Sequence, residues 1–462
     1  YQRSRGLGDV YKRQVLCLGI CDKIVPGLMM GCLNYGHLPV VFVPGGPMPS
    51  GIGNDEKARI RREFAEGKID RNTLLKGESD SYHSPGTCTF YGTANSNQML
   101  MEIMGMQLPG SSFVNPGTLH RNLLNEKAVE LASENGKLGL ERSISRIINE
   151  KSIVNAIIGL LATGGSTNHT IHLIAIAKAA GIIINWDDMS ELSDFIPLIT
   201  RMYPNGAADV NHFHAAGGMC YVIKTLLDKG LLHEDVVTIL GTGLRRFTEE
   251  SKIREGKIHF EKGTDTSLNL NVIRSAEDPF SKDGGIKILK GNIGRSVVKT
   301  AAVDPENRIV EAPAIVFHEQ EDLINAFNNG ELNKDFIAVV PFQGPKQNGM
   351  PELHNLTPSL TILQKRGYKV GLVTDGRMSG ASGKIPAAIH LTPEAIEAGP
   401  IAQIRNGDII RINCDKGTLE LINFDEVSKR NPSTVERKNT SSLGRGLFAI
   451  CLLYTSPSPR DR

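Results

Sequence analysis

Two cysteines stand in surroundings that suit metal binding: Cys21 opens the run Cys-Asp-Lys, and Cys88 lies in SPGTCTFYGTAN. A thiolate is a soft ligand that suits iron–sulfur iron, whereas the adjacent carboxylate of Asp22 is a hard ligand that suits magnesium. Pro-Gly pairs at 26–27 and 85–86 mark turns, which favour exposed thiols. The pattern indicates two neighbouring metals. Free cysteines are also common as buried apolar filler, and spacing alone leaves both interpretations open.

Two glycine-rich loops in the second half of the chain could hold the rest of an active site. They are GPKQNGMPE at 344–352 and TDGRMSGASGK at 374–384, and each follows a predicted strand, where α/β proteins commonly bind ligands. Glycines let backbone N–H groups approach an anion closely, although neither loop has the Walker pattern GxxxxGK[ST]. Either loop alone could be a plain turn. Their candidate site residues are Lys346, Glu352, Arg377, Ser379 and Lys384.

The elements that must position the two cysteines are mostly helical. Apolar periodicity predicts a buried strand at 40–43 and helices at 55–66 and 93–104. It also predicts a helix pair at 153–162 and 167–180, joined through the Thr-Gly-Gly-Ser run between them. The first half is therefore expected to place helices around a short sheet.

The helical pattern stops near 276–285, in AEDPFSKDGG, and short apolar runs follow it. Such runs, bounded by turn residues, predict strands. We therefore expect an N-terminal domain at 15–280 and a β-rich C-terminal domain at 281–450. The predicted strands are 296–300, 309–317, 336–342, 369–374 and 408–413.

Both ends of the chain resemble translated sequencing-library adaptor. One oligonucleotide can encode SRGLGDVYKRQ at 4–14, and its reverse complement, read one base in, encodes CLLYTSPSPR at 451–460. We exclude the tails 1–14 and 451–462 from the prediction of the fold. Their six basic side chains exceed their two acidic ones, so the body between them is slightly acidic despite the overall charge of +2.

This charge balance does not call for a nucleic acid or an anionic membrane as a partner. No apolar run approaches the length of a membrane span. The six cysteines of the body lack the spacing of a disulfide framework, which predicts a reducing, cytoplasmic location.

Taken together and in this order, the four motifs resemble the family of dihydroxy-acid and sugar-acid dehydratases. They are CDKxxPG, GTCTFYGTAN, GPKxxGMPE and TDGRMSGASG, and the likeness covers essentially all of 15–450. The resemblance implies an α/β fold whose N-terminal α/β domain holds an iron–sulfur site. It also implies a C-terminal domain like a swivelling β/α barrel, with the active site between the two domains. A homodimer is implied as well.

The resemblance also implies roles for individual residues. Cys21 and Cys88 would ligate the cluster. A third cysteine and a further magnesium carboxylate would come from a segment N-terminal to residue 15. This chain alone would therefore hold no complete cluster. The sugar-phosphate branch of the family indicates a 4Fe–4S cluster and the branched-chain branch a 2Fe–2S cluster. Asp22, Lys23 (as an amine or its carbamate) and Glu352 would fall at a Mg²⁺ site.

The reaction implied by the resemblance is a hydro-lyase reaction. The run CTFYGTAN is similar to the sugar-acid phosphate branch, which dehydrates 6-phospho-D-gluconate to 2-dehydro-3-deoxy-6-phospho-D-gluconate in the Entner–Doudoroff pathway. Ser379 would accept the C2 proton as an alkoxide stabilised by nearby cations, because a free serine is far too weak an acid. The candidates for binding the phosphate of this small-molecule substrate are Lys346, Arg377 and Lys384.

Alternatives from within and outside the family remain open. The substrate could be a non-phosphorylated aldonic acid or a branched-chain 2,3-dihydroxy acid, or the chain could be a structural or regulatory iron–sulfur protein without turnover. We expect Cys17 to pack in the core, and the Cys-Asp-Lys run at 414–416 to be a coincidence. The histidines His169 and His172 are expected to be satisfied core residues on a helix. His83, which precedes the Cys88 loop, is the histidine most worth testing.

Overall fold

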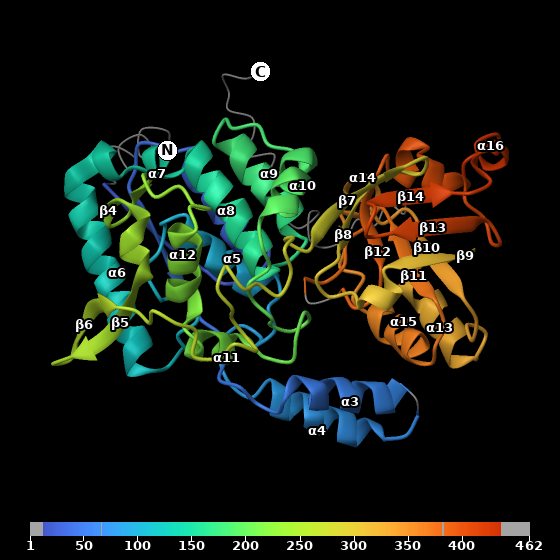
Figure 1. The fold of residues 1–462 in the computed structure, drawn as a ribbon, viewed down its shortest axis with the longest axis horizontal. Helices are drawn as coiled ribbons and strands as arrows, with labels where there is room; N and C mark the ends of the chain where they lie inside the picture. Colours follow the sequence, from blue (N-terminus) through green and yellow to red (C-terminus); the bar gives the residue numbers. More distant parts are fainter. Residues whose placement is uncertain (1–12, 66, 381–382, 436–462) are drawn as a thin grey trace, which may run out of the picture.

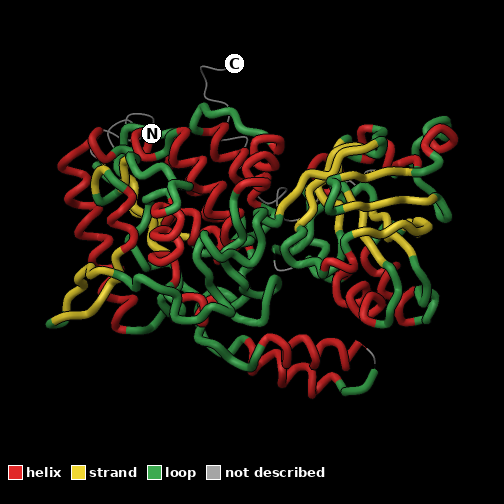
Figure 2. Tube along the Cα trace, viewed as in Figure 1, coloured by secondary structure: helices red, strands yellow, loops and turns green. Residues whose placement is uncertain are grey.

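The computed structural model describes residues 13–65, 67–380 and 383–435, so nearly all of the predicted terminal tails lies outside the described residues. Figure 1 shows a mixed α/β chain whose first half is built mainly from helices and whose second half is built around a barrel. Figure 2 shows the same division, with most of the strand segments gathered in the second half. No described helix is both long and apolar enough to cross a bilayer.

The N-terminal half surrounds two short parallel strands with helices. The strands β1 (Val15–Gly19) and β2 (Val40–Pro44) pair in register from Val15 opposite Val40. Helix α5 (Thr93–Ile103) is buried at every position except Ala94, including its polar side chains, so it forms the centre of this half. The other helices are α2 (Ile24–Leu33), α3 (Asn54–Ala65), α4 (Arg71–Ser81), α6 (Leu119–Leu138), α7 (Ile144–Ile147), α8 (Glu150–Thr163), α9 (His169–Ala179), α10 (Trp186–Phe195), α11 (Val210–Ala215) and α12 (Gly218–Asp228).

The helix pair α8 and α9 shows how local sequence builds the turn between them. Asn149 and Ser152 form a capping box at the start of α8, which satisfies two backbone donors of its first turn. At the other end Gly164 has φ +59°, the left-handed conformation that glycine adopts without strain, and its N–H donates to the carbonyls of both Leu160 and Leu161. Helix α8 therefore ends at Thr163, one residue beyond the predicted end, and the 164–168 turn leads into α9 at His169.

The C-terminal half is a closed eight-stranded barrel, ordered β10-β11-β12-β8-β7-β14-β13-β9. Helices α13 (Gln320–Asn328) and α15 (Leu356–Lys365) lie beside it, together with the short α14 (Pro345–Asn348) and α16 (Phe424–Val427). The strands are β7 (Ile286–Gly291), β8 (Gly294–Lys299), β9 (Ile309–Val316), β10 (Phe336–Val340), β11 (Val370–Thr374), β12 (Ala387–Thr392), β13 (Ile409–Asn413) and β14 (Thr418–Leu421).

Two strands of this barrel matter most for the site. The runs FIAVV and VGLVT form β10 and β11, which are parallel neighbours and fully buried, as expected of continuous, largely apolar runs in a covered sheet. The carboxyl ends of parallel neighbours lie at the same edge, so the loops at 341–355 and 375–386 start side by side.

The expected strands at 296–300, 309–317, 336–342, 369–374 and 408–413 correspond to β8, β9, β10, β11 and β13. The strands β1, β7, β12 and β14 are not among those predicted, and neither is the surface hairpin of β5 (Glu249–Arg254) and β6 (Lys257–Lys262). Two further strands, β3 (Val237–Thr238) and β4 (Gly241–Thr242), are only two residues long. The barrel begins at Ile286, and a domain boundary at residue 280 stays a prediction.

Candidate active site

The Cys-Asp-Lys segment forms the turn between β1 and α2. Asn97 on α5 donates its side-chain N–H to the carbonyl of Cys21 at 3.3 Å and to that of Asp22 at 3.0 Å, which fixes the turn against the buried helix. The thiol-bearing Cys21 is exposed. Lys23 occupies the N-cap position of α2 and is also exposed. It pairs with none of the described carboxylates, so the structure does not bring it to Glu352.

Cys88 lies in the loop that leads into the same helix. Asn95 donates to the carbonyl of Cys88 at 2.7 Å and to that of Phe90 at 2.6 Å. Burial raises the pKa of the Cys88 thiol, and the neighbouring Cys21 raises it further. A hydrogen bond from the Phe90 backbone and the charge of the Lys57 ammonium lower it in part. Two asparagines on one helix thus hold the loops of both candidate cluster cysteines.

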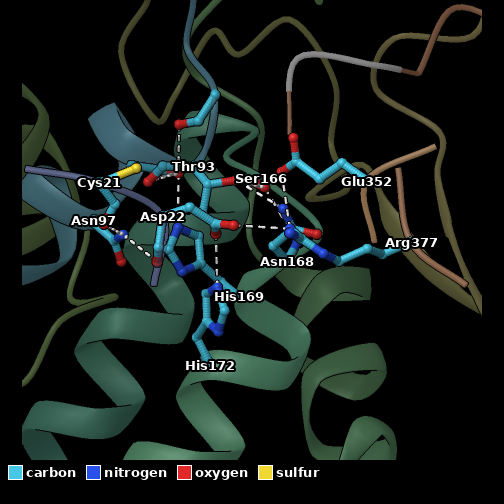
Figure 3. A network of polar contacts seen from close by, with 12 residues as sticks. Cys21, Asp22, Thr93, Asn97, Ser166, Asn168, His169, His172, Glu352 and Arg377 are labelled. Carbon is cyan, nitrogen blue, oxygen red and sulfur yellow. Dashed lines mark hydrogen bonds and ion pairs between the residues drawn. The ribbon is translucent and has the colours of Figure 1, made fainter. Parts of the chain in front are cut away.

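One arginine connects the carboxylates of the two domains. Arg377, only 5% exposed, donates from Nη1 to Asp22 Oδ2 at 2.8 Å and to Glu352 Oε1 at 2.9 Å. Its Nε donates to the Met350 carbonyl at 2.8 Å. His172 Nε2 contacts the other oxygen of Asp22 at 2.9 Å. Figure 3 shows that these side chains converge on Asp22 from α9 on one side and from the two barrel loops on the other.

The ionisation of Asp22 is strongly favoured by this network. Burial opposes its charge, but the hydrogen bond from His172 and the charge of Arg377 outweigh burial and lower the pKa of Asp22 to about 2. A carboxylate that stays ionised at every physiological pH suits a cation ligand.

We expect Asp22→Asn to destabilise the metal-free chain by about 2 kcal/mol at pH 6, because a pKa difference of one unit corresponds to about 1.4 kcal/mol. The folded pKa lies below the unfolded value, so this contribution is present above about pH 4 and is lost as the pH falls towards 2. Urea unfolding of both proteins between pH 2.5 and 6 measures it.

Asp187→Asn is the matched control. Asp187 pairs with Lys290 and Arg295 on the surface, where solvent screens the ion pairs, so its removal should leave the urea midpoint unchanged. Two results would contradict the prediction that the ionised Asp22 carboxylate stabilises the fold. One is equal destabilisation by the two variants, and the other is a difference in stability between Asp22→Asn and the unmodified chain that does not shrink in acid.

The loops of β10 and β11 are tied together by the buried Asp375. Its carboxylate accepts from the backbone N–H groups of Phe342 at 3.1 Å, Gln343 at 2.8 Å and Ala395 at 2.9 Å. Further along, the Leu353 N–H donates to the Arg377 carbonyl at 2.9 Å, and Glu352 and Arg377 form an isolated parallel bridge. These contacts place the predicted carboxylate and the predicted cation side by side.

Gly380, which follows Ser379, packs against the N-terminal half of the chain. A Cβ at Gly380 would lie less than 3 Å from the Thr93 backbone nitrogen and from the Ser166 hydroxyl, so only glycine allows this approach. Ser379 is half-buried and is therefore held beside the first residue of α5. The partial positive charge at a helix N-terminus favours a developing negative charge there.

Ser379 also lines a small cavity with an unexpected cation, Lys299, at the end of β8. Lys299 is buried and donates from Nζ to the Gly164 carbonyl at 2.9 Å, across the interface between the halves of the chain. Burial lowers the pKa of Lys299 to about 7.

The three predicted phosphate-binding cations lie in different places. Lys346 is exposed and pairs with Glu397, while Arg377 holds Asp22 and Glu352. Lys384 lies over the ring of Tyr203, with Nζ 4.9 Å from its centroid, in a cleft of about 790 Å³ between the two halves that Arg201 also lines.

Several residues at the site are not predictable from the sequence pattern, and His172 is not the satisfied core residue that the pattern favours. His172 instead contacts Asp22, while His169 is fully buried and contacts Ser96 at 2.7 Å. The expected helix did carry a clue, because His169 and His172 are three residues apart and therefore share a face. His83 is exposed.

The remaining cysteines lie apart from the candidate site. Cys17 is buried in the core, as predicted, with its sulfur 3.4 Å from that of Cys32. Cys414 is buried in the barrel core. Within the described ranges, no group of three or more His, Cys, Asp or Glu side chains is arranged to hold a metal ion. The cysteine pair Cys21 and Cys88 is thus a partial ligand set.

Comparison with known proteins assigns the chain to a family. Two family models match it: the N-terminal domain of dihydroxy-acid/6-phosphogluconate dehydratases over residues 13–247, and the C-terminal domain over residues 271–453. The chain is 56% identical over 440 residues to phosphogluconate dehydratase of Pseudomonas aeruginosa and 55% identical over 437 residues to that of Escherichia coli K12. Each alignment covers 94% of this chain and 72% of the relative.

A more distant relative is dihydroxy-acid dehydratase of Acetivibrio thermocellus, 36% identical over 425 residues, which are 89% of this chain and 72% of that protein. The matches span both halves that contribute to the Asp22, Arg377 and Glu352 network. The chain belongs to the dihydroxy-acid/6-phosphogluconate dehydratase family.

Proposed function

We propose that this hydro-lyase dehydrates 6-phospho-D-gluconate to 2-dehydro-3-deoxy-6-phospho-D-gluconate, the dehydration step of the Entner–Doudoroff pathway. The observation that carries the proposal is the unequal similarity to the two branches of the family. The chain is much closer to the relatives named phosphogluconate dehydratase than to the one named dihydroxy-acid dehydratase. A location in the cytoplasm and a homodimeric state are part of the proposal.

The family depends on an iron–sulfur cluster, and the residues present fit one. Cys21 and Cys88 are soft donors on neighbouring loops, and asparagines of α5 hold both loops. We propose that these two cysteines ligate the cluster, with four irons favoured over two. Iron and sulfide content distinguishes the two cluster types.

A magnesium ion is a further part of the proposal. Oxygens of Asp22 and Glu352 already converge on one cationic nitrogen of Arg377, and oxygen ligands are what Mg²⁺ requires. Lys23 would have to turn towards them from the start of α2 to take part. When bound, the two metals supply Lewis-acid assistance to the leaving C3 hydroxyl and neutralise the substrate carboxylate.

The protein's own groups then handle the proton and the orientation of the substrate. Ser379, at the N-terminus of α5, takes the proton from C2, a transfer that needs its alkoxide. Loss of the C3 hydroxyl leaves an enol, which tautomerises to the 2-keto acid. The wider cleft could receive the phosphate end of the substrate, where Lys384 and Arg201 offer positive charge. Lys346 and Arg377 are less suited to this role, because each is engaged with carboxylates.

Anaerobic turnover by the chain extended to the length of its relatives tests the proposal. Formation of 2-keto acid from 6-phosphogluconate, with kcat/KM at least 100-fold above that for gluconate, is the expected result. A preference for gluconate, or for a branched-chain 2,3-dihydroxy acid, would move the assignment to that substrate. A protein that carries its full cluster yet turns over none of the three acids would point to a structural role.

A further inference from the structure

Lys299 is buried at the interface of the two halves, and none of the acidic residues that the structure describes pairs with it. It is 5% exposed, and its amine donates to the Gly164 carbonyl. Burial alone accounts for its lowered pKa, and no described carboxylate forms an ion pair with it. A lysine in this position costs folding free energy, because its charged form is stripped of water. A lysine buried at such a cost indicates a role in binding or catalysis.

Apart from Lys299, the described residues that line the cavity it shares with Ser379 are uncharged. The other lining residues are apolar side chains, Thr167 and two positions of the glycine-rich loop. The described residues that line the cavity are Thr167, Lys299, Met378, Ser379, Gly383, Ile385, Ala387 and Ile389. A Cβ at Gly383 would lie 3.4 Å from Cδ of Lys299, so the lysine stem runs along the loop that carries Ser379.

The titratable groups on the packed elements lie outside this cavity. They include Lys287 and Lys290 on β7, Arg295 on β8, His390 on β12, Lys384 next to Gly383, and His169 beyond the 164–168 turn. Arg377 precedes Ser379 in the same loop, but its guanidinium is held by Asp22 and Glu352. Among the described cavity-lining residues, Lys299 is therefore the one with an amine that can change its charge near neutral pH.

We propose that Lys299 is the proton acceptor that activates Ser379. The inference rests on the proposed function, in which Ser379 removes the C2 proton, and it adds the group that makes a serine basic enough for this step. Lys299 acts through Ser379 and touches no substrate atom. The arrangement is a serine–lysine pair assembled from β8 and the loop after β11.

The proton and electron balance closes within the site. The Oγ–H bond of Ser379 breaks, and its proton joins the lone pair of the neutral Lys299 amine. The Ser379 oxygen takes the C2 proton, the C2–H electron pair becomes the C2–C3 double bond, and the C3–O bond breaks with its electron pair on oxygen. The ammonium passes its proton, through water, to the departing hydroxide. Serine and amine are restored, and the products are the enol and one water molecule.

The hydrogen bond to Gly164 orients the amine for this transfer. A neutral amine has two N–H donors and one lone pair, so it can donate to the Gly164 carbonyl while the lone pair faces the cavity. Because burial lowers the pKa of Lys299 to about 7, much of the amine is neutral at pH 7 to 8.

The pH dependence of kcat/KM for Lys299→Gln tests the proposal in the full-length holoenzyme. Glutamine keeps a donor for Gly164 but cannot accept a proton. The unmodified enzyme should lose rate below about pH 7, whereas the variant should be about 10²- to 10⁴-fold slower at pH 7.5, with no break near pH 7. Lys290→Gln, which removes an exposed ion pair on β7, is the control and should keep the profile unchanged. A break near pH 7 that persists in Lys299→Gln, or a rate loss of only a few fold, would overturn the proposal.

Failure of the proposed role of Lys299 can be distinguished from failure of the proposed substrate. If the unmodified enzyme turns over a bare sugar acid instead of 6-phosphogluconate, the substrate assignment fails and the same profiles are measured with that acid.

Urea unfolding gives a second readout that needs no turnover. In the unfolded chain the lysine pKa is about 10.4, so between pH 7 and 10 the unfolded chain binds the extra proton and the native state gains stability as the pH rises. The urea midpoint of the 462-residue chain should rise with pH more steeply than that of Lys299→Met. Parallel pH dependences would mean that Lys299 is charged in the folded protein, which would overturn the proposal.

Discussion

Replacing Ser379 with alanine is expected to lower kcat/KM for 6-phosphogluconate by about 10²- to 10⁴-fold, the usual contribution of a positioned acid–base group. The loss should appear in kcat, because the hydroxyl acts on the C2 proton during the reaction and not in binding. The iron content and the urea midpoint should stay unchanged, since Ser379 is half-buried and the close contact with α5 is made by Gly380. Anaerobic assays of 2-keto acid formation measure the effect.

A second serine of the barrel provides the control for Ser379. Ser296 lies on β8, and its hydroxyl is buried with no hydrogen-bond partner among the described residues, so Ser296→Ala should leave activity unchanged. A Ser379→Ala protein that keeps its cluster and stays within threefold of the unmodified rate would remove Ser379 from the mechanism. A rise in KM with kcat unchanged would instead make Ser379 a binding residue.

The fold could be predicted from sequence where the pattern is local. The runs FIAVV and VGLVT are continuous and apolar, and they are the buried parallel strands β10 and β11. From that pairing it follows that the loops after them lie together, so the proximity of Glu352 and Arg377 was accessible to sequence reasoning. The run AAIHLT of β12 was missed because it continues the glycine-rich loop without a break.

The contacts across the interface could not be predicted in this way. Asp22 and Arg377 are 355 residues apart, and Asp22 and His172 are 150 residues apart, with no periodicity that relates them. Lys299 ends an apolar strand run, where a lysine normally reaches solvent. Its burial follows only from the way the 164–168 turn and the Ser379 loop close over the end of β8, which no local pattern encodes.

Cys88→Ser is expected to remove the cluster from the full-length protein. A serine oxygen is a hard, weakly acidic donor that replaces a thiolate poorly on iron, and Cys21 on the neighbouring loop would then be left without its partner. The backbone should be undisturbed, because Asn95 holds the carbonyl of residue 88 and not its side chain. Iron and sulfide content after anaerobic reconstitution should fall close to zero, and turnover should fall below detection.

The second Cys-Asp-Lys run in the chain supplies a matched control for this variant. Cys414 begins the same tripeptide as Cys21, but it is buried in the barrel core, away from the α5 asparagines. If the tripeptide itself attracted iron, Cys414→Ser would lower the iron content, whereas the proposed site requires it to keep the full amount. Full iron content in Cys88→Ser would contradict the assignment of Cys88 as a ligand. The comparison of Cys88→Ser with Cys414→Ser therefore separates the contribution of the motif to iron binding from that of the fold. Of the two Cys-Asp-Lys runs, the first is the one that α5 places beside a second thiol and that Arg377 places beside a second carboxylate.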